Sequence, residues 1–135
     1  MEKNLASSNP RIIVIQKLYS YYLNKDSELH FPKHRYKKFI KDVVNGTIER
    51  KDLIQNLIDN ELKDYINENK TGLILKLMIM AAIFEFMFMH KTPIKVIIAE
   101  YLKVSDSFTD RSQKKFLNAI LDKASKISRV SDITK

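Results

Sequence analysis

Apolar residues recur every three to four positions along most of this chain, which is the spacing typical of amphipathic helices. The first such stretch opens with Asn9 and Pro10, an N-cap residue followed by proline at the first helical position. A polar stretch over residues 25–29 interrupts the pattern. The sequence therefore predicts a first helix that begins at Pro10 and presents the apolar positions Ile12, Ile15, Tyr19, Tyr22 and Leu23.

Further amphipathic stretches follow with their own boundary signals. The second begins after Pro32 and is expected to end near Gly46, because glycine commonly terminates helices. Thr92 with Pro93 marks another start, and Asp110 can cap the last helix. The predicted amphipathic helices after the first cover residues 33–46, 53–66, 93–105 and 110–127.

One stretch, residues 73–89, is apolar on nearly every side. Its 17 residues reach the short limit for crossing a bilayer, but Lys76 and Glu85 lie within it. The central helix of a bundle has the same character, and we favour that interpretation over a membrane span. No segment alternates with period two. We expect an all-α, compact bundle of about six or seven helices in a single domain over residues 1–135.

Composition removes several classes of protein. The chain has no cysteine and only two glycines, which excludes a disulfide framework, a thiolate nucleophile and a glycine-rich phosphate loop. The first ten residues hold no apolar signal segment, so we expect a cytoplasmic protein. The formal charge of +8 comes from nineteen lysines and five arginines, and this lysine-rich profile alone gives weak support for a polyanion partner.

The placement of charge is more informative than its total. Residues 30–41 carry five Lys and Arg and no acid, residues 111–129 carry six against one acid, and residues 49–68 are acidic. This asymmetry is consistent with an RNA or DNA footprint on the first and last helices, although a solvated lysine-rich surface would give the same pattern.

The search for catalytic or metal-binding groups yields little. His30 and His34 have the spacing of metal ligands on one helix face, but Pro32 lies between them, so a solvated basic loop is the better interpretation. Glu85 and Glu100 each occur within an apolar helix, where a carboxylate needs a hydrogen-bond partner or an interface. We predict no enzyme, no cofactor and no metal site.

Four sequence blocks resemble the NusB family of transcription antitermination factors. IQKLYSYYL at residues 15–23 is similar to the family's Q-x-L-Y helix, and AIFEF at 82–86 is similar to its A-x-Y-E-L element. TPIKVIIAEYLKVSDSF at 92–108 and KFLNAILDK at 115–123 match two further elements. The blocks occur in the family's order and spacing across essentially the whole chain.

The resemblance implies two packed sub-bundles and a non-enzymatic RNA-binding protein. Family members bind the boxA element of nascent ribosomal RNA together with the small-subunit ribosomal protein NusE, and they support antitermination by RNA polymerase. The residues expected to contact single-stranded RNA are Arg11, Gln16, Lys17, Tyr19, Lys114, Lys115, Phe116 and Asn118. Tyr19 and Phe116 are also candidates for the core. The residues expected at the partner interface, on the central helices, are Phe84, Glu85 and Glu100.

The chain departs from the family pattern where an arginine cluster is expected, because residues 7–10 read Ser-Ser-Asn-Pro and Arg11 alone remains. Met80, Ala99 and Ser112 replace other residues common in the family. The basic residues 33–41 could compensate for the lost arginines. Two alternatives stay open: a protein-interaction module with weakened RNA binding, and an RNA-binding domain of the kind attached to ribosomal-RNA methyltransferases.

Overall fold

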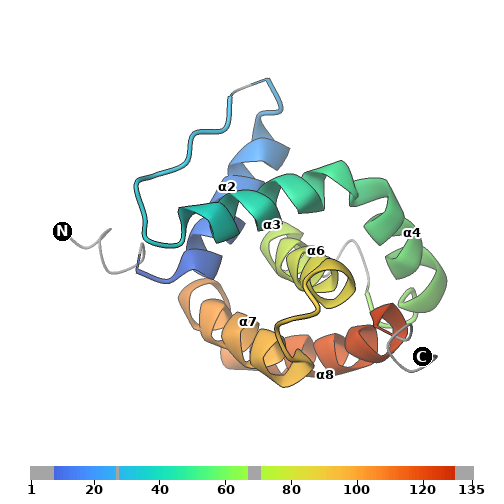
Figure 1. Ribbon diagram of the computed structural model, residues 1–135. Coiled ribbons are helices and arrows are strands. Elements are labelled where there is room, and N and C mark those ends of the chain that lie inside the picture. The colour runs from blue at the N-terminus through green and yellow to red at the C-terminus, as the bar shows by residue number, and fades with distance from the viewer. Residues whose placement is uncertain (1–7, 27, 67–70, 130–135) are drawn as a thin grey trace.

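The computed structural model describes residues 8–26, 28–66 and 71–129, in which six α-helices and no strand occur (Figure 1). The helices are α2 (Pro10–Leu23), α3 (Lys37–Glu49), α4 (Lys51–Glu61), α6 (Leu73–Phe88), α7 (Ile94–Phe108) and α8 (Arg111–Ser128). The predicted all-α class and number of helices are confirmed.

Helix α6 runs through the middle of the molecule, and the other five helices surround it (Figure 1). Helices α2, α3 and α4 form one group against it, and α7 and α8 pack together as the second group. The predicted pair of sub-bundles is therefore confirmed, with α6 as their shared core. Across the part of the chain that the structure describes, no helix is long and apolar enough to cross a membrane.

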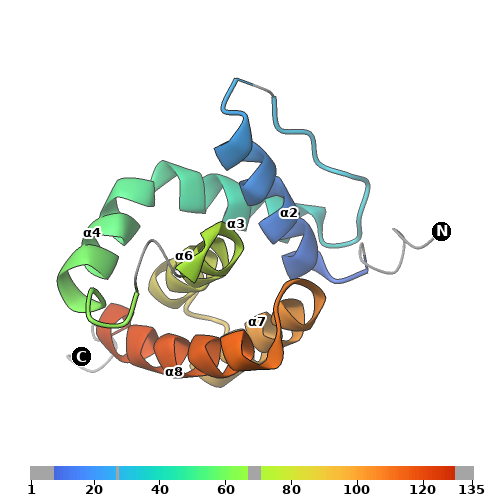
Figure 2. The ribbon, with the colours of Figure 1, turned by 180° about the vertical axis from the view of Figure 1, so that it is seen from behind.

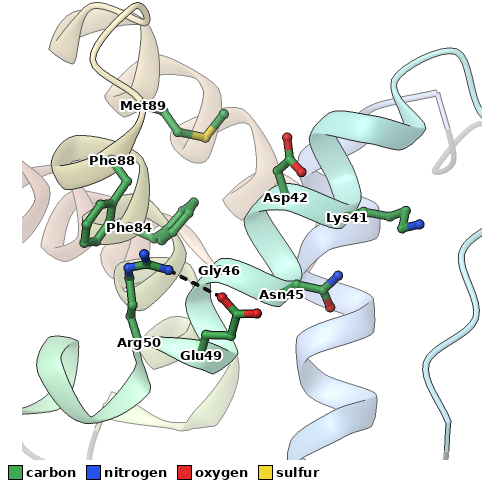
Figure 3. Close-up of a pocket in the computed structure, with 9 residues that line it drawn as sticks. All are labelled: Lys41, Asp42, Asn45, Gly46, Glu49, Arg50, Phe84, Phe88 and Met89. Atoms are coloured by element: carbon green, nitrogen blue, oxygen red, sulfur yellow. Dashed lines mark hydrogen bonds and ion pairs between the residues drawn. The ribbon is translucent and has the colours of Figure 1, made fainter.

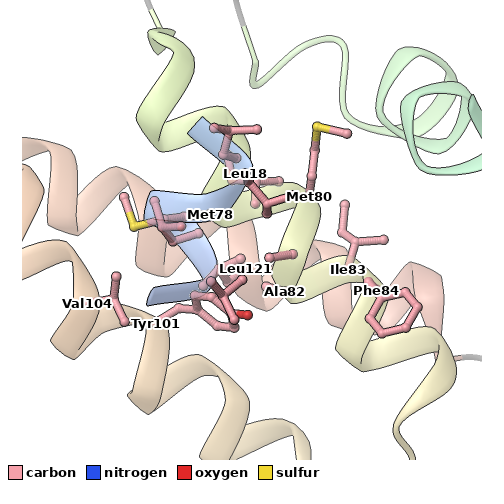
Figure 4. Packing of buried hydrophobic residues seen from close by; sticks show 14 of the residues in the cluster. Leu18, Met78, Met80, Ala82, Ile83, Phe84, Tyr101, Val104 and Leu121 are labelled. Atoms are coloured by element: carbon pink, nitrogen blue, oxygen red, sulfur yellow. The ribbon is translucent and has the colours of Figure 1, made fainter. Parts of the chain in front are cut away.

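The hydrophobic core consists of side chains from all six helices, packed around α6. Figure 4 shows Leu18 of α2, Tyr101 of α7 and Leu121 of α8 around the residues of α6. Because α6 is covered on all sides, its apolar residues need no narrow stripe, which explains why its sequence resembled a membrane span.

Two helix starts follow the predicted capping chemistry. The Asn9 side chain accepts a hydrogen bond from the backbone N–H of Arg11 at 2.9 Å, and Pro10 is the first residue of α2. Asp110 and Gln113 form a reciprocal capping box at the start of α8, with bonds of 2.9 and 3.1 Å. These caps satisfy backbone donors that would otherwise lack partners.

The predicted end of the second helix near Gly46 is wrong, because α3 continues to Glu49. Gly46 is buried inside the helix, and a Cβ atom there would collide with the ring of Phe84 on α6. The glycine therefore allows a close helix crossing and does not terminate the helix.

Two predicted starts also differ: α3 begins at Lys37 and not directly after Pro32, and α7 begins at Ile94 with Pro93, not Thr92, as its N-cap residue. Smaller differences are that α4 ends at Glu61 and that α7 extends to Phe108.

Candidate nucleic-acid interface

Arg11 occupies the interior near the start of α2, although the family resemblance placed it among the expected RNA contacts. Its Nε atom donates to Glu85 Oε2 at 2.9 Å and its Nη2 atom donates to Glu85 Oε1 at 2.7 Å. The residue is 8% exposed and Glu85 is fully buried. This bidentate pair occupies both side chains, so in this structure neither Arg11 nor Glu85 is exposed to an RNA or protein partner.

Tyr101 of α7 adds a third side chain to this ion pair, since its hydroxyl donates a hydrogen bond to Glu85 Oε2 at 2.5 Å. Burial, followed by the negative charge of Glu85, raises the pKa of Tyr101 well above its ordinary value. Burial lowers the pKa of Arg11, but the hydrogen bond to Glu85 and the nearby acidic groups of Tyr101, Glu85 and Glu100 outweigh this effect and raise it overall. The three side chains thus join α2, α6 and α7 through one buried polar cluster.

Glu100 lies at the outer edge of this cluster. Its Oε1 atom is 4.0 Å from Arg11 Nη1, its Oε2 atom accepts from Lys103 Nζ at 3.4 Å, and its side chain is 29% exposed. With Pro10, Arg11, Tyr36 and Phe39 it lines a pocket of about 370 Å³. Glu100 therefore reaches solvent, unlike Glu85.

The other expected RNA contacts fall on two helices that share a face of the molecule. In the view of Figure 2, α2 crosses in front of α3, and α8 crosses in front of α7. On α2, Gln16 and Tyr19 are exposed and Lys17 is half-buried. Gln16 and Tyr19 are thus the accessible members of the group on α2.

The residues on α8 divide in a similar way. Lys115 and Asn118 are exposed, whereas Lys114 and Phe116 are half-buried. Lys114 Nζ contacts Asp106 Oδ1 at 2.9 Å, and Phe116 packs against the hydrophobic core. Lys115 and Asn118 are thus the more accessible members of this group.

Phe84 lies beside a second pocket, of about 480 Å³, between α3 and the end of α6 (Figure 3). Its ring is mostly buried against Gly46, whereas the neighbouring Phe88 is 41% exposed. The guanidinium carbon of Arg50 lies 4.4 Å from the centre of the Phe88 ring, a cation–π arrangement. Sequence reasoning missed Phe88 and Arg50, since one reads as part of the apolar run and the other as a surface charge.

Arg129 is one of the six basic residues in the predicted basic segment 111–129, but it is buried at the end of α8. Its guanidinium donates to the carbonyl oxygens of Phe86 at 2.7 Å, Thr92 at 2.9 Å, Glu85 at 3.0 Å and Met89 at 3.2 Å. Three of these oxygens belong to the last turn of α6 and its C-cap residue. Arg129 therefore caps the central helix and neutralises its negative end.

In the ranges 8–26, 28–66 and 71–129, no group of three or more His, Asp or Glu side chains is placed to hold a metal ion. His30, one of the two histidines with ligand-like spacing, is exposed, and its Nε2 atom lies 3.7 Å from Glu28 Oε1.

Comparison with known proteins identifies the family. The family model described as "NusB family" matches residues 8–126. The chain belongs to the NusB family. A similar protein, the transcription antitermination protein NusB of Bradyrhizobium diazoefficiens, is 30% identical over 84 residues, which are 62% of this chain and 51% of that protein. The transcription antitermination protein NusB of Rickettsia massiliae is 26% identical over 117 residues, which are 84% of this chain and 75% of that protein.

The resemblance inferred from the four sequence blocks is thus confirmed at the level of the NusB family. Family membership and the names of these relatives support a role in transcription antitermination. The aligned region spans about half the length of the Bradyrhizobium NusB protein and about three quarters of the Rickettsia one.

Proposed function

We propose that this protein is a cytoplasmic, non-enzymatic antitermination factor that binds boxA-type RNA of nascent ribosomal transcripts together with the ribosomal protein NusE. The complex would support antitermination by RNA polymerase. The observation that carries the proposal is the match to the NusB family over residues 8–126, which includes all of α2 and all but the last two residues of α8, the two helices expected to contact RNA.

The accessible residues of α2 and α8 suit single-stranded RNA. Lys115 is exposed and can neutralise a phosphate, while Gln16 and Asn118 carry amides that can bond to base edges. Tyr19 is 37% exposed and offers a surface on which a base can stack. Lys17, Lys114 and Phe116 are half-buried and would contribute at the margins.

The pocket beside Phe84 and Phe88 is the proposed docking site for NusE. An aromatic side chain that is nearly half exposed, next to a buried aromatic and an arginine, is typical of the residues that dominate protein interfaces. Glu100 lies away from this pocket and lines a different one, so its role in partner binding has less support than that of Phe84.

A titration of boxA-type RNA tests the proposal, with this protein alone and with NusE, across a series of salt concentrations. The expected result is binding that NusE strengthens, that salt weakens and that mutation of boxA reduces. RNA binding that is indifferent to both NusE and the boxA sequence would contradict the proposal.

The burial of Arg11 favours one second candidate, a protein-interaction module in which RNA binding has been lost. The expected arginine cluster is reduced to this residue, and its guanidinium is bound to Glu85. NusE binding with no RNA binding in the same titration would support this alternative. The methyltransferase-associated domain has no comparable observation in its favour.

A further inference from the structure

The pocket beside Glu100 lies where the beginnings of α2 and α3 approach α7 (Figure 1). Its volume of about 370 Å³ exceeds that of one nucleobase. Two aromatic side chains, Tyr36 and Phe39, form part of its wall, and the Glu100 carboxylate forms another part. Aromatic surface next to a hydrogen-bonding group is the combination by which proteins hold an unstacked base.

Tyr36 is the accessible aromatic group of this pocket. The residue is 47% exposed and is the N-cap of α3. The guanidinium carbon of Arg35 lies 5.3 Å from the centre of its ring. Phe39, in contrast, is half-buried and packs against the Arg11 guanidinium, 4.7 Å from its ring centre. Tyr36 is therefore the lining ring that a base arriving from solvent can reach most easily.

The positive charge around Tyr36 favours the binding of a polyanion. Residues 30–41 carry five cations and no acid, and Lys33, Arg35 and Lys37 are all exposed. The nearest carboxylate that follows in the sequence, Asp42, is paired with Lys38 at 2.9 Å. Phosphates of an RNA strand that passes along this segment would meet positive charge on both sides of Tyr36.

Glu100 would select among bases, because a carboxylate accepts hydrogen bonds but cannot donate them. Guanine presents two adjacent N–H groups on its Watson–Crick edge, and cytosine and adenine each present an amino group. Uracil offers a single N–H group, and the two carbonyl oxygens beside it are repelled by a carboxylate. The contacts that Glu100 makes with Lys103 and Arg11, at 3.4 and 4.0 Å, leave it capacity to accept further hydrogen bonds.

We infer that Tyr36 and Glu100 form a binding pocket for one RNA base, with guanine preferred over uracil, beside the basic segment 33–41. This site would lie apart from the Gln16 and Lys115 contacts and would supply affinity that the missing N-terminal arginines do not. The inference rests on the proposed RNA-binding function, but it concerns a separate surface and can fail separately.

The test uses the full-length protein without NusE and measures its affinity for short oligonucleotides. The probes are an oligouridine, the same strand with one guanosine in the middle, and the same strand with one inosine, which lacks the amino group. We expect guanosine to bind about tenfold tighter than uridine, with inosine between them. Tyr36→Ala should weaken binding of the guanosine strand about tenfold, whereas Tyr36→Phe should retain it.

Glu100→Gln provides the specificity readout, because an amide both donates and accepts and so tolerates uracil. The ratio of guanosine to uridine affinities should fall towards one, while the loss of a negative charge leaves overall affinity equal or higher. Glu61→Gln and Tyr65→Ala are matched controls at exposed positions and should change neither quantity. Circular dichroism of each variant checks that the helical fold is retained.

Two results would overturn the inference. One is an unchanged guanosine preference in Glu100→Gln, and the other is undiminished RNA binding in Tyr36→Ala. If either occurs while boxA RNA still binds with NusE, the proposed function stands and the pocket is excluded. A guanosine preference that depends on Glu100, without any effect of NusE, would instead support the pocket and contradict the proposed function.

Discussion

Arg11 and Glu85 are 74 positions apart in the sequence, and their side chains form a bidentate ion pair in the interior. The pair links the first described helix to the central one, and Tyr101 adds a hydrogen bond from α7. A buried charge is stable only when its partner is present, so each of these residues depends on the other.

Arg11→Met should therefore destabilise the protein by about 3–5 kcal/mol, because it leaves the Glu85 carboxylate buried without its cation. The double variant Arg11→Met/Glu85→Leu removes both charges and should recover much of this loss. Urea unfolding followed by circular dichroism measures both free energies. Lys17→Met, on the same helix, is the control; if it costs as much as Arg11→Met, the effect is not due to the ion pair.

Tyr101 should make stability depend on alkaline pH. Its pKa is raised in the folded state by burial and then by Glu85, so an unfolded chain loses this proton at a lower pH than the folded one. The unfolded state then binds fewer protons, and the free energy of unfolding falls as pH rises above about 10. This one group can lower the free energy of unfolding by up to about 1.4 kcal/mol for each pH unit.

Tyr101→Phe should remove this part of the pH dependence, at a cost of about 1.5–3 kcal/mol at neutral pH for the lost hydrogen bond to a charged group. Tyr65→Phe, at an exposed position, is the control and should leave the wild-type slope unchanged. Equal slopes in wild type and Tyr101→Phe between pH 9 and 11 would contradict the assignment.

The sequence predicted the helices well because their signals are local. Periodicity, the Asn9 cap and the Asp110 cap depend on neighbours within one turn, and the structure confirms them, although the predicted Thr92 cap is wrong because Pro93 is the N-cap residue of α7. Gly46 misled the prediction because its role depends on Phe84, which lies on another helix. A glycine in a close helix crossing and a glycine at a helix end look alike in a single sequence.

The candidate site was harder to predict for a related reason. The positions of charged residues along a sequence do not reveal which cations are exposed. Two of the five arginines, Arg11 and Arg129, are buried against a carboxylate and against backbone carbonyl oxygens. The Arg11 partner lies on α6 and the carbonyl partners of Arg129 lie at or beyond the end of α6. Only the fold brings these groups together.

Arg129 should be required for the stability of α6 and not for RNA binding. Arg129→Met leaves carbonyl oxygens at the end of α6 without their donor and should cost about 2–4 kcal/mol. Arg129→Lys should restore only part of this loss, since an ammonium group cannot reach the same set of oxygens as the planar guanidinium. Thermal unfolding measures the difference.

Lys126→Ala is the control for that experiment, because Lys126 is exposed. Among the salt bridges of the described residues it pairs only with Asp122, one helical turn away, with 3.3 Å between Lys126 Nζ and Asp122 Oδ2. Its effect should stay below about 0.5 kcal/mol. A loss in Lys126→Ala as large as that in Arg129→Met would indicate a general effect of charge on α8.

Phe88→Ala should weaken NusE binding while leaving the fold intact. The ring is 41% exposed beside the Phe84 pocket, so its removal creates little cavity in the core but deletes an aromatic contact and the stacking of Arg50. We expect a loss of about 1–2 kcal/mol in binding free energy, measured by isothermal titration calorimetry. Val96→Ala, an exposed apolar residue on α7, should have no effect, and equal losses in the two variants would exclude this pocket as the docking site.

Lys115→Ala should weaken RNA binding through the loss of one phosphate contact. The side chain is exposed on α8, and α8 and α2 are both on the near side of the molecule in Figure 2. Neutralising one phosphate contributes about 0.7 to the slope of log affinity against log salt for a single strand, so the slope should fall by about that amount. Fluorescence anisotropy with boxA RNA and NusE across a salt series measures it. Lys95→Ala, at an exposed position on α7, should leave the slope unchanged. An equal decrease in both variants would mean that RNA binding responds to total charge and not to Lys115 in particular.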